Sequence, residues 1–312
     1  MARADASRRP GRLGVGVVGA GRVGAVLGAA LRSAGHAVVG VSAVSEASRE
    51  RAESLLPGVP VLEVPDVIER AELVLLAVPD DALPTLVEGL AQLGAWQAGQ
   101  LVVHTSGRYG TSVLGPARAA GAIPLAIHPA MTFTGLSLDL GRLPDSMFGI
   151  TAPAAVLPIA QALVVEMGAE PVVIEEESRA LYHAALAHAS NHLVTLAAQS
   201  SQLLSDIGVQ HPDRLLGPLM KASLENALSA GEGALTGPVA RGDAGTVRAH
   251  RAALESHDAP DTRQAYLGMA RATALRALER GILSPAQGQA ILAVLADTPA
   301  DGPPGGPDAP RP

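Results

Sequence analysis

The sequence predicts an α/β protein with a doubly wound domain at residues 13–176, followed by an all-helical domain at residues 177–296. In the first part, short and continuously apolar runs alternate with helical patterns, which is typical of strands buried on both faces of a parallel sheet. A glycine-rich turn follows the first of these runs. After residue 176 the strand signals stop and long Ala- and Leu-rich stretches with helical spacing follow, which indicates a separate helical domain.

The predicted elements follow in order along the chain. The runs expected to form strands are Val15–Val18, Ala37–Val41, Leu73–Val78, Leu101–His104, Ile123–Ile127, Phe148–Thr151 and Val172–Ile174. The helices expected in the second domain are Ser178–Ile207, Pro212–Ala230, Asp243–Glu255 and Thr262–Arg280. The polar ends, residues 1–12 and 297–312, are expected to be disordered tails.

Composition excludes several classes of function. The 312 residues are 48% hydrophobic and 17% charged, so the chain has ample material for packed cores. A net charge of −7, without a cluster of Lys and Arg, argues against a nucleic-acid partner. No apolar stretch is long enough for a membrane span. Cysteine is absent, which excludes disulfides and Cys-type zinc sites and fits a cytoplasmic protein.

The glycine-rich turn has the spacing G-x-G-x-x-G, directly after the first strand and before a helical run. Gly19 allows the tight turn, Gly21 allows the backbone to approach a pyrophosphate, and Gly24 allows the helix to pack closely on the strand. Arg22 and Val23 complete the loop, and the amides at the start of the helix favour an anion. Such spacing arises by chance in a chain with 34 glycines, but its place between strand and helix predicts a dinucleotide-binding Rossmann domain.

The end of the second strand predicts which dinucleotide is bound. An enzyme that uses NAD has an acidic residue there, about 20 residues after the glycines, to bind the ribose hydroxyls. Here the position falls near Ser42, and both Ser42 and Ser45 can donate to a 2′-phosphate. Arg49 is within reach if the loop folds back, although it is equally an ordinary surface charge. Glu46 and Glu50 weaken the inference, which nevertheless favours NADP(H).

Three loops follow the carboxyl ends of predicted strands, where ligands bind in doubly wound folds. Val78 and Pro79 are expected beside the nicotinamide, although Pro79 is equally a residue that ends the strand. Ser106 is expected to contact the cofactor and His128 the substrate, because polar groups buried at strand ends need hydrogen-bonding partners.

Polar residues gather in one stretch of the first long helix of the helical domain. His183 is a candidate proton donor to a carbonyl oxygen, and Asn191 a candidate for holding the substrate. The alternative is that these are hydrogen-bonded core groups. His188 and His192 have the spacing of metal ligands, but no H-E-x-x-H motif is present, and we expect no metal.

Two later segments supply further candidates. Lys221 is a second candidate for the catalytic proton donor, and Asn226 lies on the same helix as a candidate for substrate binding. Arg241 is expected to bind a substrate carboxylate, since a guanidinium can do so with two parallel hydrogen bonds. Asp243, after it, is expected to cap the next helix.

Taken together, these motifs resemble one family, the Rossmann-like proteins with the domain of unknown function 2520, related to pyrroline-5-carboxylate reductase and ketopantoate reductase. The resemblance covers Leu13 to about Ala296. The segments that carry it are Gly19–Gly24, Ala77–Asp80, His104–Gly107, His128–Pro129 with Thr132–Phe133, Tyr182–His183 with Asn191, and Leu235–Pro238 with Arg241–Asp243.

The resemblance implies a C-terminal domain of the 6-phosphogluconate-dehydrogenase type, a homodimer, and an NADP-dependent oxidoreductase that acts on a carbonyl group. Its first candidate reaction is the reduction of 2-dehydropantoate (ketopantoate) in pantothenate biosynthesis. Ketopantoate reductases use a Lys and an Asn on the first interdomain helix, whereas this chain has His183 and Asn191 there. The proton donor is therefore expected to be His183 first and Lys221 second. The alternatives are a cyclic-imine reductase and an NADP-binding regulatory protein without catalysis.

Overall fold

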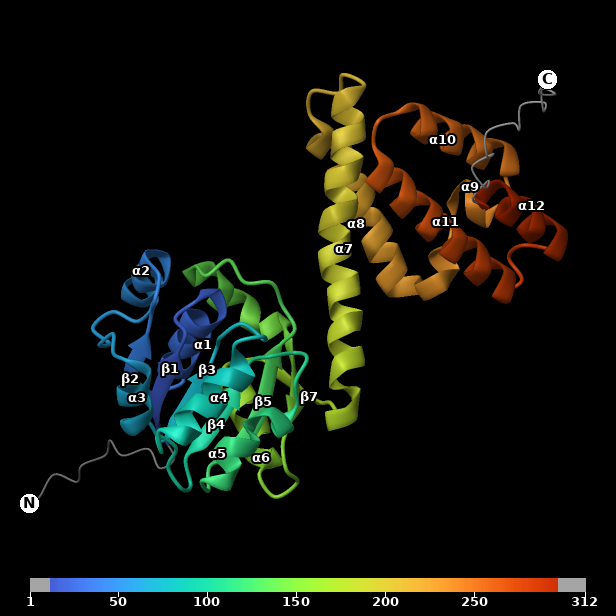
Figure 1. Ribbon diagram of the computed structural model, residues 1–312. Coiled ribbons are helices and arrows are strands. Elements are labelled where there is room, and N and C mark those ends of the chain that lie inside the picture. Colours follow the sequence, from blue (N-terminus) through green and yellow to red (C-terminus); the bar gives the residue numbers. More distant parts are fainter. Residues whose placement is uncertain (1–11, 297–312) are drawn as a thin grey trace, which may run out of the picture. The chain divides into compact units, whose positions relative to one another are not determined.

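The computed structural model describes residues 12–296 and separates into two compact units, divided between His192 and Leu193 (Figure 1). The division falls inside one long helix, later along the chain than the boundary expected at residue 176. The first part of that helix belongs to the N-terminal unit because Arg179 and Tyr182 make their contacts with the sheet there. The expected tails lie outside the described residues, except for Arg12.

One sheet of seven strands forms the centre of the first unit, in the order β2-β1-β3-β4-β5-β6-β7. The strands are β1 (Gly14–Val18), β2 (Ala37–Ser42), β3 (Leu73–Leu76), β4 (Leu101–His104), β5 (Ile123–Pro129), β6 (Met147–Thr151) and β7 (Glu170–Val173). Every predicted run is therefore a strand, within a few residues at its ends.

The sheet is parallel, as expected, except at one pair, since β5 and β6 are antiparallel, with His128 opposite Gly149. A parallel pair needs a crossover back to the opposite end of the sheet, usually by an α-helix. Between β5 and β6 the chain makes only a 3-10 segment, η2 (Ser137–Asp145), and returns from the edge at which it left.

Helices cover both faces of the sheet, which confirms the doubly wound architecture. One face packs against α1 (Arg22–Ser33), α2 (Glu46–Leu55) and α6 (Leu157–Glu166). The other packs against α3 (Val64–Glu69), α4 (Leu83–Gln92) and α5 (Gly115–Ala119). Two further 3-10 segments are η1 (Thr111–Leu114) and η3 (Glu176–Ser178).

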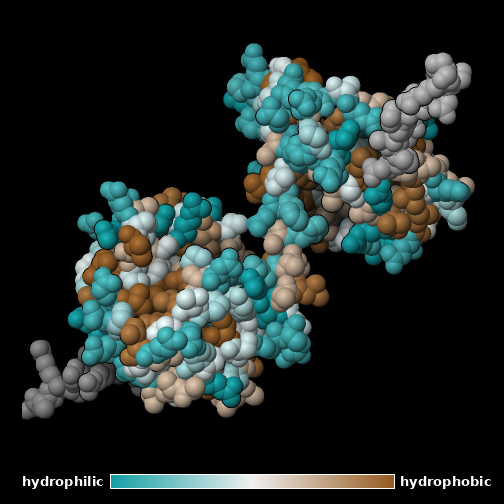
Figure 2. Space-filling model, in the orientation of Figure 1, coloured by the Kyte–Doolittle hydropathy of each residue, from teal (hydrophilic) through white to brown (hydrophobic). Residues whose placement is uncertain are grey.

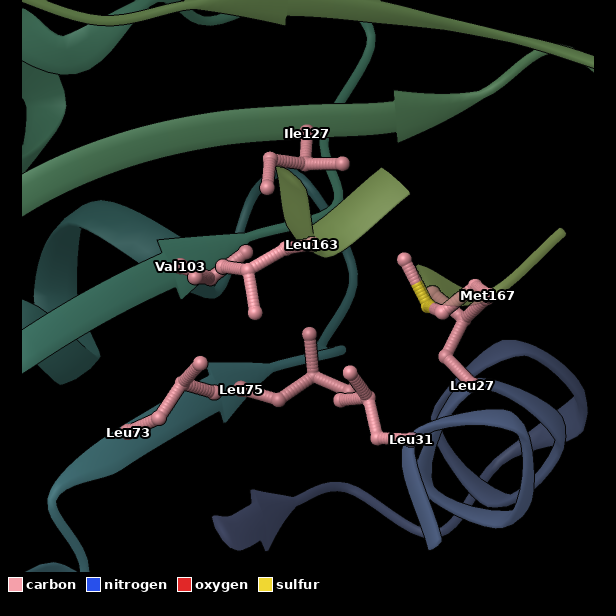
Figure 3. A pocket seen from close by; sticks show the side chains of 8 residues that line it. All are labelled: Leu27, Leu31, Leu73, Leu75, Val103, Ile127, Leu163 and Met167. Carbon is pink, nitrogen blue, oxygen red and sulfur yellow. The ribbon is translucent and has the colours of Figure 1, made fainter. Parts of the chain in front are cut away.

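The core between α1, α6 and the sheet is almost completely filled (Figure 3). A void of about 10 Å³ remains, which is about the size of one water molecule. Its lining is entirely apolar, and a water there would find none of the polar partners it needs. The lining residues are Leu27, Leu31, Leu73, Leu75, Val103, Ile127, Leu163 and Met167.

The second unit is helical, as predicted, and begins in the later part of α7 (Arg179–Asp206). The elements that follow are α8 (Pro212–Ala230), the 3-10 segment η4 (Gly231–Ala234), α9 (Gly237–Ala240), α10 (Ala244–Ser256), α11 (Pro260–Glu279) and α12 (Pro285–Leu295). The side chain of Asp243 accepts the Thr246 N–H at 3.1 Å, which confirms it as the cap of α10. Helices α9 and α12 were not among the predicted elements.

The second unit has only a small core, built from α9, α10, α11 and α12. No residue of α8 is buried, although the helix carries several leucines. Hydrophobic side chains are visible on the surface of this unit (Figure 2). Among the described residues, none of the helices has the length and apolar character needed to cross a bilayer.

Candidate functional site

The glycine-rich loop joins β1 to α1 in the conformation that its sequence predicts. Gly19 has φ of 93°, a region open mainly to glycine, and a Cβ there would lie 2.6 Å from the carbonyl oxygen of Ala77. A Cβ on Gly24 would collide with the Gly19 carbonyl, so the helix packs closely only because this residue is glycine. Nothing lies within 4 Å of the Cβ position of Gly21. The loop thus keeps its backbone open on one side, as a pyrophosphate requires.

The two serines near the end of β2 have structural roles in this loop. Ser42 is buried, and its hydroxyl oxygen accepts the Gly19 N–H at 3.0 Å. The hydroxyl of Ser45 caps α2 by accepting the Ser48 N–H at 3.2 Å. Both hydroxyl oxygens are therefore engaged within the protein. Their assignment to a 2′-phosphate stays a prediction, and a guanidinium is the stronger candidate for that contact.

Two arginines converge beside the loop at Gly135. A Cβ on Gly135 would lie 2.9 Å from Arg51 Nε and 3.1 Å from Arg22 Cγ. Arg22 is the first residue of α1, and Arg51 lies on α2. The helices that precede and follow β2 in the chain therefore bring the two side chains together. Within residues 12–296 neither guanidinium, nor that of Arg49, forms a hydrogen bond or ion pair. No sequence pattern indicated Arg51, because Gly135 is distant along the chain.

The turn after β4 is organised by a fully buried histidine. His104 donates from Nε2 to the Gly110 carbonyl at 2.8 Å, and its Nδ1 accepts the Ser106 N–H at 3.2 Å. Burial lowers the pKa of His104 to about 4, so the ring is neutral at physiological pH. The Ser106 hydroxyl accepts the N–H groups of Arg108 and Tyr109. This network fixes the turn, whereas cofactor binding by Ser106 stays a prediction.

A cluster of polar rings lies against this turn. Nδ1 of His128, at the end of β5, is 2.9 Å from the hydroxyl of Tyr182 on α7. The ring centroids of His128 and His183 are 5.8 Å apart. A Cβ on Gly107 would lie 2.9 Å from His128 Nε2 and 2.8 Å from His183 Cδ2, so both rings approach the backbone of Gly107. Two predicted site residues, His128 and His183, are thus brought together, although they are far apart in sequence.

A buried cation stands behind this cluster. Arg179, at the start of α7, is only 1% exposed and donates to the carbonyls of Ala126 and Gly149 at 3.0 Å. Its Nε donates to the Thr151 hydroxyl at 2.7 Å. Within the described part of the chain its Nη1 has no hydrogen-bonding partner. Burial lowers the Arg179 pKa to about 10, so the group keeps its charge near neutral pH. Sequence reasoning missed this residue, since an arginine opening a helix ordinarily lies on the surface.

Electrostatics in the cluster follow from burial and from this charge. Burial lowers the pKa of His128 to about 4, with further lowering by His183 and Arg179. Burial also raises the pKa of Tyr182 above its ordinary value, so its hydroxyl stays protonated near pH 7. At that pH the cluster therefore presents a neutral imidazole hydrogen-bonded to a protonated phenol.

The remaining candidates of the first unit lie outside this cluster of contacts. Val78 packs against the core and Pro79 is exposed, at the turn into α4. Asn191 is exposed on α7. His188 and His192 approach each other at 2.8 Å between their Nδ1 atoms on an exposed face. Across residues 12–296 no group of three or more His, Cys, Asp or Glu side chains is placed to hold a metal.

Three predicted site residues belong to the second unit. Lys221 and Asn226 lie on α8 and are exposed. Arg241 is exposed at the end of α9, beside the capping residue Asp243. The roles expected for Lys221, Asn226 and Arg241 stay predictions.

Both parts of the chain match known domain families. Residues 1–129 match the Rossmann-like domain family, and residues 146–273 match the domain of unknown function DUF2520. The chain thus combines a Rossmann-like domain with a DUF2520 domain. This confirms the resemblance inferred from the motifs. The DUF2520 match includes Arg179, Tyr182 and His183, and the Rossmann-like match ends at Pro129, directly after His128. No curated protein sequence matches the chain.

Solved structures with the same fold extend over most of this DUF2520 protein. A provisionally named NADP oxidoreductase from Bacteroides fragilis has a TM-score of 0.71 at 21% identity, covering 84% of this chain and 98% of its own. Protein TM1727 from Thermotoga maritima has a TM-score of 0.62 at 25% identity, with the same coverage of 84% and 98%. An imine reductase from a Pseudomonas species has a TM-score of 0.55 at 19% identity, covering 91% and 92%. Pyrroline-5-carboxylate reductases, such as that of Streptococcus pyogenes, also share the fold.

Proposed function

We propose that this protein is an NADP-dependent reductase of a small carbonyl acid, with 2-dehydropantoate as the first substrate to test. The observation that carries the proposal is that the dinucleotide loop follows the carboxyl end of β1, while His128, which meets His183, lies at the carboxyl end of β5, on the same edge of one sheet. Ligands of doubly wound folds bind at that edge of the sheet. The fold relatives named above, an NADP oxidoreductase and an imine reductase, agree with reductase chemistry.

The residues of the glycine loop fit a dinucleotide phosphate. Gly21 leaves space for the pyrophosphate, and the start of α1 has no side-chain cap to compete for its amides. No carboxylate ends β2, and Arg22 with Arg51 offers positive charge beside it. These features favour NADP(H), which when bound supplies the hydride. Arg51 therefore joins Ser42, Ser45 and Arg22 as a candidate for the 2′-phosphate.

The ring cluster supplies the hydrogen bonds that reduction of a carbonyl needs. We assign His183 as the proton donor, because it adjoins Gly107 and His128 at the edge of the cluster and is partly exposed. Neutral His128 is suited to hold the substrate oxygen by a hydrogen bond without competing for the proton. Asn191 and Arg241 stay candidates for the substrate carboxylate, and Lys221 is the second candidate donor.

The direct test is consumption of NADPH by the purified protein with ketopantoate, followed at the nicotinamide absorbance band. His183→Ala should slow turnover by at least about a hundredfold, the low end for general acid–base catalysis. His211→Ala, an exposed histidine of the second unit, is the matched control and should leave the rate unchanged.

A panel of substrates distinguishes the alternatives. Turnover of 1-pyrroline-5-carboxylate but not ketopantoate would identify a cyclic-imine reductase, which two of the fold relatives favour by name. Tight NADPH binding without turnover of any keto acid or imine would indicate instead a regulatory nucleotide-binding protein without catalysis.

We also propose that the second unit pairs with a second copy of the chain. Leu215, Leu219 and Leu228 on α8 are 51%, 59% and 80% exposed, and the helix buries no residue of its own. Isolated apolar residues are normal on a surface, but repeated leucines on an otherwise unpacked helix favour an interface. Sedimentation should show a dimer that Leu219→Glu dissociates, while Leu93→Glu, at an exposed position in the first unit, should not.

A further inference from the structure

The contact between Tyr182 and His128 joins two elements at the edge of the candidate site. The tyrosine hydroxyl lies 2.9 Å from His128 Nδ1, and the two rings meet edge to face with centroids 5.6 Å apart. The opposite nitrogen of the same imidazole, Nε2, faces the backbone of Gly107 beside His183. Nδ1 of His128 is thus hydrogen-bonded within the protein, and Nε2 faces the backbone of Gly107 and the ring of His183.

The hydrogen bond between Tyr182 and His128 determines which way the phenol proton points. A phenol O–H is a strong donor and its oxygen a weak acceptor, whereas the unprotonated nitrogen of a neutral imidazole is a strong acceptor. The Tyr182 O–H therefore donates to His128 Nδ1, the acceptor 2.9 Å away. A neutral imidazole that accepts at Nδ1 carries its hydrogen on Nε2.

We propose that Tyr182 is a positioning residue that holds His128 in its Nε2–H tautomer, so that the site offers a substrate oxygen or carboxylate a hydrogen-bond donor at this position. The proposal rests on the reductase function proposed above for its consequence in catalysis. The tautomer itself follows from the geometry of the apoprotein. It assigns Tyr182 a task that the sequence motif alone did not define.

The charges around His128 keep that donor neutral. The groups facing it are His104 from β4, and Arg179, Tyr182 and His183 from α7. None of them is an anion at neutral pH, and Arg179 is a buried cation that opposes a second positive charge. Among the described residues no salt bridge neutralises Arg179. The ring therefore donates from Nε2 and accepts at Nδ1 across the physiological range.

The experiment compares Tyr182→Phe with Tyr266→Phe. Tyr266 is a matched control because its hydroxyl also bonds a histidine, His250, at 3.0 Å, in the second unit. Nitrogen-15 NMR of the imidazole side chains reads the tautomer directly and needs no substrate. We expect wild type and Tyr266→Phe to show His128 protonated at Nε2, and Tyr182→Phe to show a mixture of both tautomers.

Kinetics provide the second readout. With the substrate identified from the panel, Tyr182→Phe should lower kcat/KM by about tenfold or more, the loss of one oriented hydrogen bond. Its affinity for NADPH should stay within about twofold of wild type, because Tyr182 is remote from the glycine loop in the chain and bonds none of its residues.

The outcomes separate this proposal from the reductase function. If no substrate turns over but the tautomer shifts in Tyr182→Phe, the reductase function fails and the positioning role stands. A wild-type His128 protonated at Nδ1, or a Tyr182→Phe variant that keeps a pure Nε2–H tautomer, overturns the proposal. The proposal is also overturned if Tyr182→Phe and Tyr266→Phe lower the thermal stability equally and shift the His128 tautomer equally. That result would reflect packing alone.

Discussion

At the scale of single residues, the cofactor preference depends on which arginine is near the ribose. The sequence offered Arg49, whereas the structure brings Arg51 to Gly135 beside Arg22. We predict that Arg51→Ala weakens NADPH binding by about tenfold or more and leaves NADH binding nearly unchanged. The reason is that a hydrogen bond to a charged group contributes about 1.5–3 kcal/mol, and only NADPH carries the extra phosphate.

Titration calorimetry with both nucleotides measures this difference. Arg118→Ala, an exposed arginine at the end of α5, is the control. Arg49→Ala belongs in the same series. If Arg49→Ala loses the preference for NADPH and Arg51→Ala keeps it, the assignment made from the sequence was the correct one.

At the scale of elements, the turn after β4 sets how closely the two histidines approach. The Cβ of Gly107→Ala would lie under 3.0 Å from His128 Nε2 and His183 Cδ2, so one of the rings must move. We predict that this variant loses tenfold to a hundredfold in kcat/KM, because a misplacement of about 1 Å at a catalytic group costs up to about a hundredfold.

The control for the turn is Gly115→Ala, at the start of α5, where a Cβ meets nothing within 4 Å. Steady-state kinetics and the NADPH dissociation constant should be measured for both variants. Full activity in Gly107→Ala would show that the rings adjust without consequence and that their spacing has no part in the chemistry.

At the scale of the whole molecule, the neutral buried histidine makes stability depend on pH. The pKa of His104 falls from 6.5 to about 4 on folding, so the unfolded chain binds a proton more readily between these values. The contribution of the neutral His104 ring to the free energy of unfolding is fully present above pH 6.5 and is lost as the pH falls toward 4. Its full size is on the order of 3 kcal/mol for a group with this shift. His128, with a similar shift, acts in the same direction.

Denaturant unfolding followed by fluorescence of Trp96, the single and buried tryptophan, reports on the first unit. The free energy of unfolding of wild type should rise from pH 5 to pH 7. His104→Gln keeps a donor and an acceptor but does not titrate, so its slope should be shallower. His211→Gln, at an exposed position of the second unit, should retain the wild-type dependence of the free energy of unfolding on pH. Identical slopes in all three proteins would exclude His104 as a source of the dependence.

Local signals in the sequence were sufficient for the strands, for the longer helices of the second unit except α12, and for the glycine loop. The apolar runs predicted every strand, and the helix expected at Pro212–Ala230 has those bounds in the structure. Both patterns depend on neighbours along the chain, which is why they can be read without the fold. The reversed direction of β6 was missed because strand direction depends on the connection in space and not on the composition of the run.

Periodicity and short motifs along the chain encode the Rossmann domain, its glycine loop and the helical domain after it. The meeting of polar residues depends on the folded arrangement. In the structure Arg179 is buried against β5 and β6, Tyr182 contacts His128, and Arg51 reaches Gly135. These contacts join residues from different elements, and their distances are set by how the helices pack on the sheet, which no pattern along the chain records.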